Sequence, residues 1–174
     1  KLRTIWLCKK MNERILVTGG NGYIGKFLVQ RLIAEGYSVG VFSKGVGEIP
    51  NVDFFQGSIL NLSDLNDVIK SFNPDVVFHF AGLTIGNSEE LKTVNFLGTK
   101  NLCESFSGKI IFASTPLVYL GGKVPFVEND SLSANGAYAE SKLLAEDHLK
   151  KRGNTLIFRI GVVYGPNQNN KMFI

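Results

Sequence analysis

Short apolar runs alternate with segments of helical period along this chain of 174 residues. The runs have the length of β-strands and are rich in β-branched and aromatic residues, as strands are. We expect strands at residues 14–18, 38–42, 52–56, 75–80, 109–113 and 156–160. The run at 75–80 holds three apolar residues in a row, Val76, Val77 and Phe78, which is typical of a strand buried on both faces.

The segments between these runs carry apolar residues at the spacing of one helix face. The first predicted helix follows the first strand and ends near Gly36. Asn61 or Ser63 caps the second, because both side chains accept hydrogen bonds from the N–H groups of a helix N-terminus. Two further helices are expected at residues 91–106 and 136–151.

Strands and helices in alternation predict a parallel sheet with right-handed crossovers. We expect an α/β fold whose doubly wound parallel sheet has the strand order 3-2-1-4-5-6, with helices on both faces. Ligands bind such sheets at the carboxyl ends of the strands. Residues 1–10 precede Met11 and lack the layout of a secretory signal, so we expect an N-terminal extension outside the fold and one domain over 11–174.

Composition and charge exclude several classes of partner. Hydrophobic residues make up 44% of the chain and charged residues 20%, as in ordinary globular proteins. The net charge is +4, but the lysines and arginines are scattered and form no basic stripe of the kind that binds nucleic acid. No run of 18 apolar residues occurs. We therefore expect neither nucleic acid nor membrane as a partner.

The two cysteines, Cys8 and Cys103, stand far apart in the sequence. Neither belongs to a Cys-x-x-Cys pair and neither has a histidine nearby, which argues against a zinc site and a disulfide framework. We expect no metal, reduced thiols and a cytoplasmic location.

A glycine motif joins the first predicted strand to the first helix. Gly19, Gly22 and Gly25 follow the strand at a spacing of three. Glycine allows a tight turn and lets backbone N–H groups approach a pyrophosphate at a helix N-terminus. The spacing is G-x-x-G-x-x-G rather than G-x-G-x-x-G. Because the motif lies between a predicted strand and a predicted helix, it favours a dinucleotide-binding site over a purely structural turn.

Tyr138 and Lys142 lie about one helical turn apart, so their side chains share a face. The pKa of a free tyrosine is about 10, and a base active near neutrality needs that pKa to fall by roughly three units. A lysine held beside the phenol shifts its pKa in that direction. Alone, such a pair is more often a solvated helix face. Together with the glycine turn, it predicts acid–base chemistry.

Four further segments fall at the ends of predicted strands or on the helix between them. They are His-Phe-Ala-Gly at 79–82, the helix stretch that begins at Asn95, Ser-Thr-Pro-Leu-Val-Tyr at 114–119 and Val-Tyr-Gly-Pro at 163–166. With the glycine turn and the Tyr–Lys pair, they resemble the extended short-chain dehydrogenase/reductases, in particular the NAD-dependent epimerase/dehydratase group that acts on nucleotide sugars. The resemblance covers about residues 13–168 and implies a Rossmann fold.

The resemblance implies a role for each matching position. Tyr138 is the acid–base residue, Lys142 binds the nicotinamide ribose and lowers the pKa of that phenol, and Thr115 hydrogen bonds the reacting hydroxyl or carbonyl. The implied cofactor-binding residues are Gly19, Gly22, Tyr23, Ile24, Gly25, Ser43, Lys44, Ser58, Ile59, Phe80, Ala81, Gly82, Asn95, Tyr138 and Lys142. We interpret His79 as a packed strand residue without a catalytic role.

The sequence departs from the family pattern at several positions. Ser43 replaces the acidic residue that accepts from the ribose hydroxyls in NAD-preferring members, and Lys44 can pair with a 2′-phosphate. This favours NADP over NAD. Ser58 stands where an aspartate commonly meets the adenine. Leu120 replaces a glycine, and Val162 replaces an asparagine that often contacts substrate in sugar epimerases. The last change weakens the epimerase interpretation against a reductase or a dehydratase.

Family members continue beyond the position of Ile174 into a substrate-binding part, which we expect to be absent from these residues. The main hypothesis is an NAD(P)-dependent epimerase, dehydratase or reductase of a nucleotide sugar, in truncated form. Two alternatives stay open: a non-catalytic dinucleotide-binding module or remnant, and a reductase of a small carbonyl compound. The resemblance also implies a homodimer through helices near 89–106 and 136–151.

Overall fold

The computed structural model describes residues 13–47, 49–119, 125–166 and 168. The expected N-terminal extension and Leu120 lie outside the described residues. The described strands form one sheet in the order β3-β2-β1-β4-β5-β6, with every neighbouring pair parallel. They are β1 (Arg14–Thr18), β2 (Ser38–Ser43), β3 (Asp53–Gln56), β4 (Val76–His79), β5 (Lys109–Ser114) and β6 (Thr155–Arg159). The predicted strand order is therefore confirmed.

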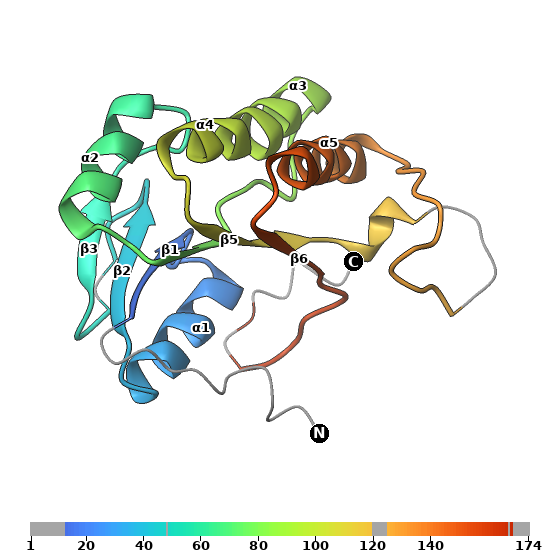
Figure 1. Ribbon diagram of the computed structural model, residues 1–174. Helices are drawn as coiled ribbons and strands as arrows, with labels where there is room; N and C mark the ends of the chain where they lie inside the picture. Colours follow the sequence, from blue (N-terminus) through green and yellow to red (C-terminus); the bar gives the residue numbers. More distant parts are fainter. Residues whose placement is uncertain (1–12, 48, 120–124, 167, 169–174) are drawn as a thin grey trace.

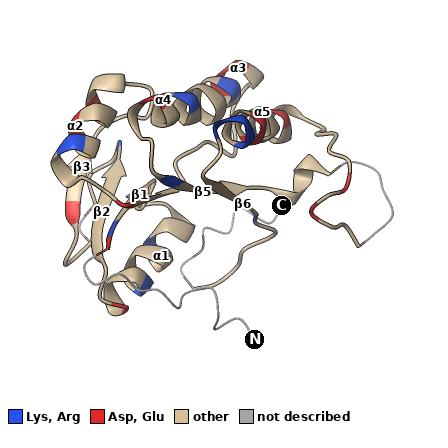
Figure 2. Ribbon diagram, viewed as in Figure 1, with Lys and Arg blue, Asp and Glu red and all other residues tan. Residues whose placement is uncertain are grey.

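Helices cover both faces of this sheet, as predicted. The longer ones are α1 (Tyr23–Ala34), α2 (Leu62–Phe72), α4 (Gly98–Ser105) and α5 (Ala137–Arg152). Figure 1 shows α1 on one face and α2, α4 and α5 on the other. Lys and Arg positions are mixed with Asp and Glu positions along α2, α4 and α5 (Figure 2). Over the described residues, no helix combines the length and the apolar character that crossing a bilayer requires.

The boundaries of two helices follow from their end residues. Asn61 is the cap of α2, and its side chain accepts from the Ser63 N–H at 2.9 Å. Asn73 ends the same helix in the left-handed conformation, with φ of 48°. That conformation stops a helix and suits asparagine better than most residues.

The helix expected over residues 91–106 is not uniform. It begins with α3 (Ser88–Leu91), continues as a π-helical segment η2 (Lys92–Leu97) and ends as α4. A capping box starts it, in which Asn87 and Glu90 each bond the other's backbone N–H. The π-helical turn is wider than an α-turn, and such turns frequently occur at functional sites. The spacing of apolar residues in this stretch predicted one helix and gave no sign of the π-helical segment within it.

The sheet separates two apolar clusters. Along β1, Leu16 packs toward α2, α4 and α5, whereas Val17 packs toward α1, because successive side chains of a strand point to opposite faces. Both residues are 0% exposed. Burial on both faces fixes the sheet rigidly between its helices. The carboxyl ends of β1, β4, β5 and β6 consequently meet along one fixed edge.

Candidate functional site

A cavity of about 550 Å³ opens at the carboxyl edge of the sheet. A second cavity of about 220 Å³ adjoins it, and both are lined by Gly19, Gly22, Phe80 and Gly82. The larger cavity reaches residues 160–163 after β6, and the smaller one reaches the ends of β2 and β3. The two form one crevice that crosses the boundary between β1 and β4. This is the point where the strand order reverses, and doubly wound folds bind their ligands there.

The glycines of the first turn serve different needs. Gly19 has φ of 72°, and a Cβ on it would lie 2.6 Å from the Ala81 nitrogen. A Cβ on Gly25 would lie 2.4 Å from the Gly19 oxygen. Gly22 has an ordinary φ of −68°, and the nearest atom to its Cβ would be the Gly19 oxygen at 3.1 Å. Gly19 and Gly25 are therefore required for packing, whereas Gly22 keeps the crevice open.

The N-terminus of α1 faces this open space. Tyr23, Ile24 and Gly25, in its first turn, line the larger cavity. The N-cap residue is Gly22, which has no side chain to cap the helix. The first N–H groups of a helix have no partners within the helix, and together with the helix dipole they favour an anion. The structure thus brings together the glycine-turn residues that the sequence predicted.

Asn95 of η2 holds the loop that follows β4. Its Oδ1 accepts from the Leu83 N–H at 2.7 Å, and its Nδ2 donates to the Leu83 oxygen at 2.9 Å. The same Nδ2 donates to the Ser141 hydroxyl at 2.9 Å, which itself donates to the Tyr138 carbonyl at 2.7 Å. Asn95 is 1% exposed and lines neither cavity. It fixes the β4 loop against α5.

His79 bridges three elements in the floor of the site. The Thr99 hydroxyl donates to the Asn95 carbonyl at 2.6 Å, so it accepts from His79 Nε2 at 3.0 Å. Nδ1 is then an acceptor for the Thr18 hydroxyl at 2.6 Å, and that hydroxyl accepts from the Ala81 N–H. The chain of hydrogen bonds requires a neutral imidazole with its proton on Nε2. It agrees with the interpretation of His79 as a packed strand residue.

Thr115 lies directly after β5, and its side chain lines the larger cavity. Its hydroxyl oxygen accepts from the Leu117 N–H at 3.3 Å and caps a 3₁₀ turn, η3 (Pro116–Val118). The residue is 6% exposed. The hydroxyl proton remains free to be directed to a second acceptor, as the predicted role requires.

Tyr138 and Lys142 project from α5 into the same cavity. The Lys142 ammonium lies 4.2 Å from the centroid of the Phe112 ring, in a cation–π contact. Burial lowers the pKa of Lys142 to about 8, and the charge of Glu146 acts in the opposite sense. Burial and the Lys142 charge lower the pKa of His79 to about 3, which keeps it neutral.

The pKa of Tyr138 is raised by burial. This net shift is opposite in sign to the one expected of a phenol activated by Lys142, and the lowering of the phenol pKa by Lys142 stays a prediction. The half-buried phenol loses hydration, which penalises its anion. The Lys142 cation is meanwhile held over Phe112. The phenol is therefore protonated at neutral pH.

The ends of β2 and β3 form the smaller cavity. Ser43, Lys44 and Ile59 line it, as the resemblance implies, and so does Ala81. Ser58 lines neither cavity. Its hydroxyl accepts from the Leu60 N–H at 3.2 Å. An adenine contact by Ser58 stays a prediction.

Several residues of the site were not predicted. An apolar wall of the larger cavity consists of Leu83, Pro116, Leu117, Ile160 and Val163. They lie within or beside segments that carry the resemblance, or at the end of a predicted strand, but none of these apolar side chains had been given a role in the site. Glu146, buried behind the site, lies four residues after Lys142. That spacing was an available signal. In the described part of the chain, no group of three or more His, Cys, Asp and Glu is placed to hold a metal.

Comparisons with known proteins agree with this geometry. The sequence is 31% identical to UDP-glucose 4-epimerase 3 of Oryza sativa subsp. japonica in an alignment of 169 residues that covers 82% of this chain and 45% of the relative. It is 36% identical to a UDP-N-acetyl-alpha-D-glucosaminuronate decarboxylase of Bacillus cytotoxicus in an alignment of 139 residues that covers 69% of this chain and 42% of that protein. The chain thus spans less than half the length of either relative.

A solved structure shows the same fold. UDP-glucose 4-epimerase of Thermus thermophilus, in complex with NAD, superposes with a TM-score of 0.83 at 29% identity. The match covers 90% of this chain and 57% of that chain. A family model described as the NAD dependent epimerase/dehydratase family matches residues 15–174. These residues include both halves of the crevice, and the chain belongs to the NAD-dependent epimerase/dehydratase family.

Proposed function

We propose that the crevice binds a nicotinamide dinucleotide, and that this chain is the cofactor-binding part of an enzyme that transfers hydride to or from a carbinol carbon of a nucleotide sugar. One observation carries the proposal. The open N-terminus of α1 and the side chains of Thr115, Tyr138 and Lys142 line a single cavity. Epimerases, dehydratases and reductases of this family share that first step.

The residues of the crevice fit a dinucleotide along its whole length. The glycine turn and the N-terminus of α1 suit the pyrophosphate. Phe80 and Ala81 pass beside the adenosine half, and Ser43 and Lys44 lie at the end where its ribose would sit. Lys142, at the other end, suits the nicotinamide ribose. We propose NADP as the preferred cofactor, because Lys44 can pair with a 2′-phosphate and no carboxylate at Ser43 repels it.

The side chains of the site have defined roles in this proposal. A nicotinamide dinucleotide held by the glycine turn and Lys142 would supply the hydride acceptor and would add positive charge to the site. Tyr138 takes the hydroxyl proton of the substrate in the oxidative direction and returns it to the carbonyl oxygen in the reductive one. Thr115 donates a hydrogen bond to the same oxygen. Because burial raises the pKa of Tyr138, the phenol is protonated and can donate its proton to the carbonyl oxygen in the reductive direction.

The apolar wall favours a second candidate, the reductase of a small carbonyl compound. Val162 lines the cavity where sugar epimerases often carry an asparagine, and Leu117 and Ile160 lie beside it. An apolar wall accepts a hydrocarbon group more readily than a sugar hydroxyl. Nucleotide sugars remain the main proposal, because both relatives named above carry a nucleotide-sugar enzyme's name.

We also propose a homodimer through the helical layer formed by η2, α4 and α5. Leu97 and Leu144 are 42% and 39% exposed on this layer. Phe96 packs edge-on against His148, with 6.2 Å between the ring centroids, so the two helices present one continuous surface. Such a surface suits packing against a second copy of the same helices.

The Gly22→Val substitution is expected to weaken binding of NADP and NAD at least tenfold, because the side chain fills the crevice at the pyrophosphate position. Helical content should stay unchanged, since the Cβ meets only the Gly19 oxygen. Calorimetric titration measures the affinity. Ala34→Val, at the exposed end of the same helix, is the control and should bind normally. Equal affinity in the Gly22 variant and the parent would refute the assigned site.

The Lys44→Ala substitution is expected to weaken NADP binding by roughly 1 kcal/mol, as for a partly exposed charge-assisted contact, and to leave NAD binding nearly unchanged. Titrations of both cofactors measure the difference. Lys70→Ala removes an exposed lysine from α2, far from the crevice, and should change neither affinity. A parent protein that binds NAD more tightly than NADP would overturn the proposed preference.

The Leu144→Arg substitution is expected to convert a dimer into a monomer, because it places a charge in the proposed contact. Light scattering at micromolar concentration gives the mass of each form. Leu62→Arg is a matched control, since Leu62 is 41% exposed on α2, outside the proposed contact. A parent chain of monomeric mass contradicts the proposal.

In a form of the protein that turns over substrate, Tyr138→Phe is expected to lower turnover about 10²- to 10⁴-fold, because it removes the group that transfers the proton. Cofactor affinity should change little, as the ring is kept. Steady-state kinetics and calorimetry separate the two effects. Tyr37→Phe, in the turn before β2 at the opposite edge of the sheet, serves as the control. An unchanged rate in the Tyr138 variant would end the proposed mechanism.

A further inference from the structure

Glu146 of α5 is a carboxylate with a 0% exposed side chain, and the mechanism above does not use it. It lies one helical turn beyond Lys142 and two turns beyond Tyr138, so the three side chains share one face of the helix. A buried carboxylate is costly unless it is paired and fully hydrogen bonded. The groups that pair with Glu146 therefore indicate its role in the structure.

Glu146 joins α5 to the ends of two strands. Its Oε1 accepts from the Ser114 hydroxyl at 2.5 Å and from Arg159 Nε at 3.1 Å. Its Oε2 accepts from Arg159 Nη2 at 2.8 Å and lies 3.3 Å from the Lys150 ammonium. Ser114 is the last residue of β5, and Arg159 is the last residue of β6.

Both strand ends lead directly into the site. Ser114 immediately precedes Thr115, and both line the cavity. Arg159 pairs with Ser114 in the sheet and immediately precedes Ile160, which also lines the cavity. Arg159 further donates to the Tyr119 hydroxyl and, at 3.1 Å, to the Glu128 carbonyl. The Glu146 carboxylate thus fixes the distance between α5 and the loops that carry Thr115 and Ile160.

We propose that Glu146 is a positioning residue for the site: through Ser114 and Arg159 it locks the helix that carries Tyr138 and Lys142 onto the strand end that carries Thr115. The proposal rests on the proposed function, since it takes Lys142 as a contact of the dinucleotide. Its second component is electrostatic. Glu146 is the nearest buried anion along α5 to Lys142, and its charge favours the ammonium form.

The effect of the Glu146 charge on the pKa of Lys142 can be measured, because few other charged groups lie close to Lys142 among the described residues. Tyr138 and Glu146 share its helix face, neutral His79 faces it from β4, and the Phe112 ring of β5 lies under its ammonium. Arg159 of β6 meets the carboxylate of Glu146 rather than the ammonium. Although burial favours the neutral acid, hydrogen bonds from Arg159 and Ser114 lower the pKa of Glu146, so the carboxylate is charged at neutral pH.

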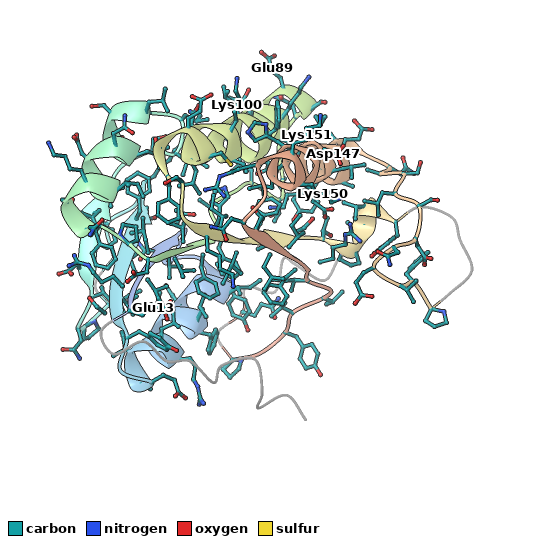
Figure 3. The ribbon with its side chains drawn as sticks, in the orientation of Figure 1. Glu13, Glu89, Lys100, Asp147, Lys150 and Lys151 are labelled. Carbon is teal, nitrogen blue, oxygen red and sulfur yellow. The ribbon has the colours of Figure 1, made fainter. Side chains whose placement is uncertain are left out.

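Titration of Lys142, followed by NMR of protein with isotope-labelled lysine, tests the electrostatic component. Lys142→Arg assigns the signal. The parent should titrate near pH 8. Glu146→Gln keeps the shape and removes the charge, so its midpoint should fall by roughly one unit. Asp147→Asn removes a charge from the exposed side of the same helix (Figure 3) and should leave the midpoint unchanged.

Dinucleotide affinity measured at pH 8 tests positioning. If the Lys142 pKa falls by one unit, the fraction of Lys142 in the ammonium form at pH 8 falls to less than about a fifth of the parent's fraction. Glu146→Gln should therefore weaken NADP binding about fivefold or more. Glu146→Asp keeps the charge but shortens the reach to Ser114, so affinity should fall while the Lys142 midpoint stays near that of the parent. The Glu146→Asp variant still tests the positioning role if the Glu146→Gln variant does not fold.

Three results would overturn the inference: a Glu146→Gln variant with an unchanged Lys142 midpoint, one whose NADP affinity equals that of the parent, and a Glu146→Asp variant with parental affinity. A parent chain that binds neither NADP nor NAD would instead refute the proposed function. The NMR titration needs no ligand, so it still tests the link between Glu146 and Lys142 in that case.

Discussion

The whole site depends on a contact between two backbones that leaves no room for a side chain. At the boundary of β1 and β4, the turn after β1 lies directly on the turn after β4, and a Cβ on Gly19 would fall within 2.8 Å of three Phe80 and Ala81 backbone atoms. The turn is fixed on its other side as well, because the Gly19 N–H donates to the Phe42 carbonyl at 2.9 Å. The carboxyl ends of β1, β2 and β4 are thereby held level with one another, and the crevice lies next to these ends.

Below this contact, buried polar groups define the geometry more strictly than apolar packing can. His79, Asn95 and Glu146 are each 0–1% exposed, and each bonds at least two other segments of the chain. A buried polar group that loses a partner costs about 1–3 kcal/mol, so such bonds tolerate little displacement. Apolar contacts are less directional and permit more sliding. The site is consequently positioned by hydrogen bonds, while the sheet and its helices are stabilised by the apolar clusters.

The sequence predicted what depends on local pattern and failed where long-range contacts decide. Alternating strand and helix periods gave the strand order, and the glycine turn, Tyr138 and Lys142 were found because each belongs to a short motif. The pairing of Glu146 with Arg159 joins residues from different elements and leaves no mark within either one. The spacing of Tyr138 and Lys142 likewise carries no information about hydration in the folded cavity, where burial raises the pKa of Tyr138.

The π-helical segment η2 has a consequence for how the chain can change. A π-helix contains one residue more than the α-helix that would fill the same place. The hydroxyl of Thr99, in the following α4, donates to the carbonyl of Asn95 in η2, and the Asn95 side chain bonds the Leu83 backbone in the loop after β4. Loss of one residue here would restore a regular helix, yet it would rotate Asn95 by about 100° away from Leu83. At this place, a deletion that makes the local helix more regular removes the support of the β4 loop, so length is constrained here as strictly as residue identity.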